Sequence, residues 1–129
     1  MNRFRVAAGI LRDDAGRVLI AQRLDDGPFD GLWEFPGGKI GAGERPMDAL
    51  TRELAEELGI RVTTAQPFLD LCHQYADREV RLWFFLVTGW QGEPRGVEQQ
   101  ALRWVHAREL DADLLLPADQ PVVDALRSL

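Results

Sequence analysis

GKIGAGERPMDALTRELAEELGI, residues 38–60 of the chain, joins a glycine-rich loop to a helical segment with glutamates on one side. Glu53, Glu56 and Glu57 are spaced i, i+3 and i+4, so on an α-helix they project within an arc of roughly 100°. Like charges at this spacing repel one another and destabilise an isolated helix. A divalent cation would neutralise them, and oxygen ligands without thiolates or paired histidines favour Mg²⁺, or Mn²⁺, over zinc. The segment therefore predicts a metal-binding helix.

The ends and the buried face of this helix are also marked. Pro46 suits the first turn of a helix, and Gly59 suits the position just after its end. An apolar stripe at helical spacing consists of Met47, Leu50, Leu54 and Leu58. Glu57 borders this stripe, so we expect its carboxylate to be partly desolvated. Arg52 lies four residues before Glu56 and can hold that side chain in place.

The composition is typical of a globular protein. The chain has 129 residues, which we expect to form one domain over residues 1–129, with 46% hydrophobic and 28% charged residues. No apolar run approaches the roughly 20 residues that span a bilayer, and the first residues lack the apolar core of a signal peptide. We therefore expect a cytoplasmic protein that does not bind membranes. A monomer is the expected state, although nothing in the sequence reveals the oligomeric state. The net charge of −6 argues against tight binding to polymeric nucleic acid, but not against a small anionic substrate that arrives with its own metal.

The sequence contains a single cysteine, Cys72, which excludes an internal disulfide and a zinc cluster of cysteines. It lies near apolar positions, so we expect a buried structural thiol rather than a nucleophile.

Apolar alternation and turn residues predict the remaining elements. Strands are expected at residues 4–11, 18–23, 68–75, 80–87 and 102–105, and a second helix from residue 119 or 120 to 129. Residues 24–38 are expected to form a long loop, and loops of that length in a compact domain are usually functional. Residues 82–86 are apolar on both faces, which indicates a central strand. The expected fold is of the α/β class, with a mixed sheet between helices on both faces.

Acidic side chains that gather Mg²⁺ suit the hydrolysis of a phosphoanhydride bond, because the charge on a di- or triphosphate must be neutralised before a nucleophile approaches. The predicted reaction is metal-assisted attack of water on phosphorus, with Glu53, Glu56 and Glu57 as metal ligands. The general base is Glu53, Glu44 or a later carboxylate, and the sequence does not choose among them.

Two neighbours of the helix add to this site. Gly37 and Gly38 allow the backbone to approach closely, and the Gly37 carbonyl is a further candidate metal ligand. Lys39 is either a contact for a phosphate or leaving group, or a solvated lysine.

The chain resembles the Nudix hydrolases, and within them the MutT-like branch of 8-oxo-dGTP diphosphatases. The defining positions of the Nudix box are all matched here at fixed spacing: Gly38, Glu44, Arg52, Glu53, Leu54, Glu56, Glu57, Gly59 and Ile60. Further matching segments are residues 6–10, 34–40, 82–87, 90–98 and 117–122. The resemblance implies a Nudix α/β/α sandwich that hydrolyses 8-oxo-dGTP to 8-oxo-dGMP and pyrophosphate, by attack of water on the β-phosphorus. The implied role is nucleotide-pool sanitation and mutation avoidance.

The same resemblance implies further site residues. Glu98 matches a metal-ligand position outside the box, and Arg52 is among the implied catalytic residues. Arg23 and Arg78 match arginines near the nucleotide, with a solvated arginine at a strand end as the alternative for each, and Glu34 is a further candidate for substrate binding. Positions that wall the base and sugar pocket in the family are Phe4, Val6, Phe35, Tyr75, Val80 and Leu116.

Asp119 departs from the MutT-like pattern, which has an asparagine that contacts the purine edge. An ionised aspartate only accepts hydrogen bonds, so it would favour the N7–H of an 8-oxopurine but repel O6 unless it is protonated in a desolvated pocket. The alternative role is an N-cap of the last helix, with Pro121 just after it. Pro28 and Arg95 also differ from the closest MutT-like sequences.

Two other functions remain open. The same chemistry could act on a cytidine nucleotide, an unmodified dNTP or a conjugate such as ADP-ribose, because the box contacts phosphates and metal rather than the base. A nucleotide sensor without turnover is the second alternative, which the intact box carboxylates disfavour.

Overall fold

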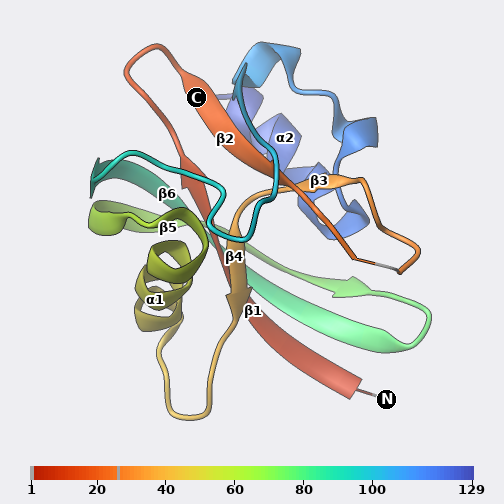
Figure 1. Ribbon diagram of the computed structural model, residues 1–129. Helices are drawn as coiled ribbons and strands as arrows, with labels where there is room; N and C mark the ends of the chain where they lie inside the picture. The colour runs from red at the N-terminus through yellow and green to blue at the C-terminus, as the bar shows by residue number, and fades with distance from the viewer. Residues whose placement is uncertain (1, 26) are drawn as a thin grey trace.

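Two α-helices lie on opposite sides of the β-strands, which makes an α/β/α sandwich (Figure 1). The computed structural model describes residues 2–25 and 27–129. In chain order the strands and helices are β1 (Asn2–Leu11), β2 (Arg17–Gln22), β3 (Trp33–Glu34), β4 (Gly37–Lys39), α1 (Pro46–Leu58), β5 (Arg61–Gln74), β6 (Arg78–Gln91), β7 (Leu102–His106) and α2 (Gln120–Arg127). Three short 3₁₀ helices precede α2: Ala107–Glu109, Ala112–Leu114 and Pro117–Asp119. The predicted fold class is confirmed.

The strands form two sheets. The larger sheet has four strands in the order β4-β1-β6-β5. β1 runs parallel to β6, whereas β4 and β5 pair antiparallel with their neighbours, so this sheet is mixed as predicted. The second sheet is antiparallel, in the order β3-β2-β7, and the sequence did not predict it as a separate unit.

The structure corrects several predicted boundaries. β6 extends to Gln91 rather than ending at residue 87, and two other corrections are larger. The expected loop at residues 24–38 contains β3 and the start of β4, whose Gly37 pairs with Ala8 of β1. Glycine has low strand propensity, which hides this strand in the sequence. β5 begins at Arg61 rather than at residue 68, and irregularities between Val62 and Leu69 break the alternation by which a strand is recognised.

Alternating residues of the central strands divide the apolar side chains between two cores. In β1, Ala8 and Ile10 face the core under α2, whereas Ala7 and Leu11 face the core under α1. β6 alternates in the same way. A Cβ on Gly9 would lie 2.9 Å from the Cδ1 atom of Leu54, so the bare glycine lets α1 pack closely on the sheet.

Helix α1 has the predicted ends. Pro46 occupies its first turn, and Gly59 adopts the left-handed conformation at its end, with φ 69°. The Gly59 N–H donates to the Ala55 carbonyl at 3.1 Å, which closes the helix. Within the described residues, no helix is long and apolar enough to cross a bilayer.

Cys72 is exposed, so the expectation of a buried thiol is wrong. It lies on β5, which forms an edge of the larger sheet. An apolar stretch of sequence therefore does not by itself identify the inward-facing residues of an irregular edge strand.

Candidate active site

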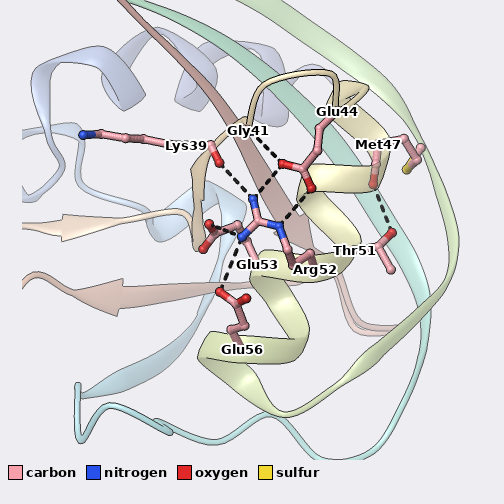
Figure 2. Close-up of polar contacts among 8 residues, drawn as sticks. All are labelled: Lys39, Gly41, Glu44, Met47, Thr51, Arg52, Glu53 and Glu56. Carbon is pink, nitrogen blue, oxygen red and sulfur yellow. Dashed lines mark hydrogen bonds and ion pairs between the residues drawn. The ribbon is translucent and has the colours of Figure 1, made fainter.

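Arg52 of α1 is the hub of the acidic side of the helix (Figure 2). Its guanidinium donates to the two carboxylate oxygens of Glu44, at 2.8 and 2.9 Å. It also donates to Glu53 at 2.9 Å, to Glu56 at 3.5 Å and to the Lys39 carbonyl at 3.1 Å. The predicted contact between Arg52 and Glu56 is thus present. The Arg52 guanidinium therefore links Glu44 in the loop before α1, the backbone of β4 and the glutamates of the helix.

Glu44 fixes the loop that leads into α1. One of its oxygens also accepts from the Gly41 N–H at 2.7 Å. The hydrogen bonds from Arg52 and Gly41 lower the pKa of Glu44 to about 2, and Glu44 and Glu53 in turn raise the pKa of Arg52. Both oxygens of Glu44 are engaged, so this carboxylate stays ionised and turned toward Arg52.

Gly37 and Gly38 bring β4 against the carboxylates of α1. The Gly37 N–H donates to Glu57 at 3.1 Å. A Cβ on Gly37 would lie 2.1 Å from the Ala7 carbonyl oxygen, and a Cβ on Gly38 would lie 2.4 Å from the carboxyl carbon of Glu53. A side chain at Gly37 would therefore collide with the backbone of β1, and one at Gly38 would displace the carboxylate of Glu53.

Glu57 lies in the least solvated part of the acidic site. Burial, followed by the nearby carboxylates of Glu53, Glu34 and Glu98, raises the pKa of Glu57 to about 8. Among the described residues no cationic side chain pairs with Glu57. This expected desolvation of Glu57 is therefore present, together with negative charge that is not compensated locally.

The donor set fits a hard divalent cation. The carboxylates and backbone carbonyls supply only oxygen ligands, which Mg²⁺ and Mn²⁺ prefer. In the part of the chain that the structure describes, no three acidic side chains converge as a ready chelating group. Arg52 holds Glu53 and Glu56 to itself, so rotations of these side chains would be needed to share one ion with Glu57.

A cavity of about 360 Å³ lies beside these glutamates. Its lining comprises Phe4, Val6, Ala8, Arg23, Phe29, Glu34, Phe35, Gly37, Gly38, Lys39, Glu57, Tyr75, Arg78, Val80, Leu82, Leu116, Ala118 and Asp119. All six predicted wall positions are among them. The cavity thus connects an apolar pocket to the box residues Gly38 and Glu57.

Asp119 is a buried residue of the cavity lining, with 3% of its surface exposed. One carboxylate oxygen accepts from the Phe35 N–H at 3.0 Å. Burial raises the pKa of Asp119 to about 8, against the lowering effect of the Phe35 hydrogen bond. Although Asp119 precedes α2, its side chain makes no capping hydrogen bond, so the capping alternative is not supported.

Arg23 and Glu34 form a polar edge of the cavity. Arg23 donates to Glu34 at 3.4 Å and makes a short ion pair with Asp25. Burial raises the pKa of Glu34, and Arg23 opposes that rise. On the other side, Arg78 lies over the Tyr75 ring, 5.3 Å from its centroid.

A second, smaller cavity of about 220 Å³ adjoins the first. Arg23, Glu34 and Glu57 line both cavities, and Glu98 and Gln100 line only the smaller one. Glu98, predicted outside the helix, is therefore placed next to Glu57.

A family model for the NUDIX domain matches residues 2–126. The chain belongs to the Nudix family. It is 40% identical to the 8-oxo-dGTP diphosphatase of Escherichia coli K12 over 100% of both chains. It is 36% identical to the CTP pyrophosphohydrolase of the same organism, over 100% of this chain and 95% of that protein. A solved MutT structure, from work on the Aliivibrio salmonicida and Vibrio cholerae proteins, matches with a TM-score of 0.83 and 37% identity over 99% of this chain and 100% of that one.

In this Nudix domain the predicted site residues fall into two adjoining groups, one around Arg52 and one that lines the cavity beside it: Arg23, Glu34, Phe35, Tyr75, Arg78 and Asp119. The box group around Arg52 comprises Lys39, Glu44, Glu53 and Glu56. The Lys39 side chain itself points away from this group (Figure 2), and its ammonium lies 4.2 Å from the centroid of the Phe4 ring in the cavity. The sequence did not single out Phe29, whose ring packs 5.3 Å from that of Tyr75. The sequence signal that could have identified Phe29 is its place as an aromatic residue in a glycine-rich loop.

Proposed function

We propose that this Nudix protein is an Mg²⁺-dependent hydrolase of oxidised purine nucleoside triphosphates, converting 8-oxo-dGTP to 8-oxo-dGMP and pyrophosphate. The observation that carries the proposal is a single cavity, which apolar side chains and the buried Asp119 line together with Gly37, Gly38 and Glu57. Such a cavity holds a base in the pocket while its phosphates reach the box. The relative with this activity aligns over the whole chain.

The cation would be held by the carboxylates of Glu53, Glu56, Glu57 and Glu98 and by the Gly37 carbonyl. When bound, it supplies positive charge that offsets the negative charge of the phosphates. Mn²⁺ is the alternative metal, because it prefers the same oxygen ligands.

Geometry narrows the choice of general base. Both oxygens of Glu44 accept hydrogen bonds from Arg52, and its pKa of about 2 makes it a weak proton acceptor. We therefore assign Glu44 to positioning Arg52, and leave Glu53 and Glu98 as candidate bases. Lys39, Arg23 and Arg78 border the cavity and offer positive charge to the phosphates.

Asp119 would contact the purine edge as a neutral acid. With a pKa of about 8 it is mostly protonated at pH 7. One oxygen accepts from Phe35, which leaves the other carboxyl oxygen to donate to O6. Substitution of the family's asparagine by aspartate is thus compatible with recognition of an 8-oxopurine. Phe35 and Tyr75 would flank the base.

A cytidine nucleotide is the second candidate substrate, because the CTP pyrophosphohydrolase also aligns over this whole chain. An ionised Asp119 would accept a hydrogen bond from the amino group of cytosine. A protonated Asp119 therefore favours the 8-oxopurine nucleotide, and an ionised Asp119 favours the cytidine nucleotide.

The test of the reaction is product analysis in ¹⁸O-labelled water with Mg²⁺ and 8-oxo-dGTP. We expect 8-oxo-dGMP and pyrophosphate, with the label in pyrophosphate because water attacks the β-phosphorus. Glu53→Gln should abolish turnover and leave the circular dichroism spectrum unchanged. Release of orthophosphate, or normal turnover by the Glu53→Gln variant, would contradict the proposal.

A further inference from the structure

The loop before β7 is attached to the end of the box helix. Helix ends leave backbone carbonyls without partners inside the helix. Here the Arg95 N–H donates to the Leu58 carbonyl at 3.0 Å, and the Val97 N–H donates to the Glu57 carbonyl at 3.1 Å. These two hydrogen bonds hold the loop that carries Glu98 next to the backbone of Glu57, whose carboxylate is the most buried of the box.

Gln100 adds a side-chain bridge to this attachment. Its amide nitrogen donates to the Glu57 carbonyl at 3.1 Å, and its amide oxygen accepts from the Glu98 N–H at 2.9 Å. Only this orientation of the amide satisfies both partners, because the opposite one would face oxygen to oxygen and N–H to N–H. One side chain thus joins the backbones of Glu57 and Glu98.

The turn between Gly96 and Gln100 makes the bridge possible. A Cβ on Gly96 would lie 2.2 Å from the Gln100 carbonyl oxygen, so only glycine permits this approach. Gln99 adopts φ 67°, and its N–H donates to the Gly96 carbonyl at 2.9 Å. This tight turn presents Glu98 at its tip.

The Glu98 side chain is exposed and has no hydrogen bond or ion pair within the described residues. It lines the same cavity of about 220 Å³ as Glu57 and Gln100. Its position toward Glu57 therefore depends on how its backbone is held.

We propose that Gln100 is a positioning residue that sets Glu98 against Glu57 across the cation site. The inference rests on the proposed function, since it takes Glu98 as a ligand. Gln100 acts through the Glu98 backbone and touches neither the cation nor the phosphates. Residues that orient metal ligands typically contribute 10–100-fold to metal affinity.

The test uses Gln100→Met, which keeps the length of the side chain and removes both hydrogen bonds. Gln91→Met, at the exposed end of β6, is the matched control.

Amide hydrogen exchange in the apoprotein reports the bridge, and Mn²⁺ affinity measured by electron paramagnetic resonance reports the site without turnover. We expect faster exchange at the Glu98 amide and at least about tenfold weaker Mn²⁺ binding in Gln100→Met only. In the Glu98→Gln background, Gln100→Met should cause little further loss, because the two residues act as one unit.

Each alternative result overturns a different claim. Unchanged exchange at the Glu98 amide would show that the bridge does not hold the loop. Faster exchange with unchanged Mn²⁺ affinity, in a protein where Glu98→Gln weakens binding, would overturn the inference and leave the proposed function intact. Unchanged Mn²⁺ affinity in Glu98→Gln itself would remove Glu98 from the proposed ligands, and the positioning role with it.

Discussion

Asp119 shows how one residue is assigned by its surroundings rather than by its place in the sequence. Its position before a proline-containing helix start suits a cap, and its position in the family pattern suits base contact. The side chain makes no capping hydrogen bond, accepts from the Phe35 N–H and lines the cavity, so geometry favours base contact. No sequence pattern reveals this choice, because it depends on Phe35, which lies between β3 and β4 and 84 residues earlier in the chain.

The ionisation of Asp119 should make the stability of the protein depend on pH. Its folded pKa of about 8 lies above the ordinary value, so the folded state binds the proton more tightly. The free energy of unfolding should therefore fall as pH rises from about 4 to about 8, and this contribution is fully present only at the acid end. Asp119→Asn should reduce this dependence in denaturant titrations by the share of Asp119, while the share of Glu57, whose pKa is also raised to about 8, remains. The same variant should show a clear change in the ratio of kcat/KM for 8-oxo-dGTP to kcat/KM for dGTP, with little change in Tm. A variant that loses only stability would contradict a role in base contact.

Gln99 provides a test of local strain. A side chain at φ 67° costs roughly 1–2 kcal/mol, and glycine avoids this cost while losing about 0.5–1 kcal/mol in chain entropy. We predict that Gln99→Gly raises the free energy of unfolding by about 0.5–1 kcal/mol, measured by urea denaturation. Gln91→Gly, in extended backbone, should lower it. Equal destabilisation by both substitutions would argue against strain at Gln99.

At the scale of elements, α1 and β4 differ in how far the sequence predicts them. Pro46, Gly59 and the leucine stripe are local signals, and the helix has the expected ends. β4 exists because Gly37 and Gly38 fit against β1 and α1, which is a property of their neighbours rather than of the glycines. The box residues were recognisable for their spacing, but the hub role of Arg52 required the folded loop.

The two glycines of β4 should respond differently to alanine. In Gly37→Ala the added Cβ meets the Ala7 backbone, which cannot move without breaking the sheet, so Tm should fall by several degrees. In Gly38→Ala the Cβ meets the carboxyl end of Glu53, which can rotate away. That variant should keep its Tm within a few degrees and lose at least about tenfold in kcat. Thermal melts and initial rates on both variants check this contrast. A loss of stability without loss of kcat in Gly38→Ala would contradict the placement of Glu53.

At the scale of the whole molecule, the strands separate two cores. The cavity lies beside Phe4 and Val6 of β1 and Val80 of β6. Apolar alternation predicted the layers, because each strand face packs on a different helix. The adjoining cavities were not predictable, since they bring together the loop of Arg23, the turn of Tyr75 and the residues before α2. The selectivity for a nucleobase therefore depends on segments that only the folded chain brings together.

The most direct test is kcat/KM for 8-oxo-dGTP, dGTP and CTP, measured side by side with Mg²⁺ at pH 7. A neutral Asp119 can donate to O6 and also accept from the N7–H that only the 8-oxopurine carries, which predicts a preference for 8-oxo-dGTP of at least about a hundredfold over both others. Equal values for the three nucleotides, or a higher value for CTP, would contradict the substrate assignment and leave the Nudix chemistry of the box in place.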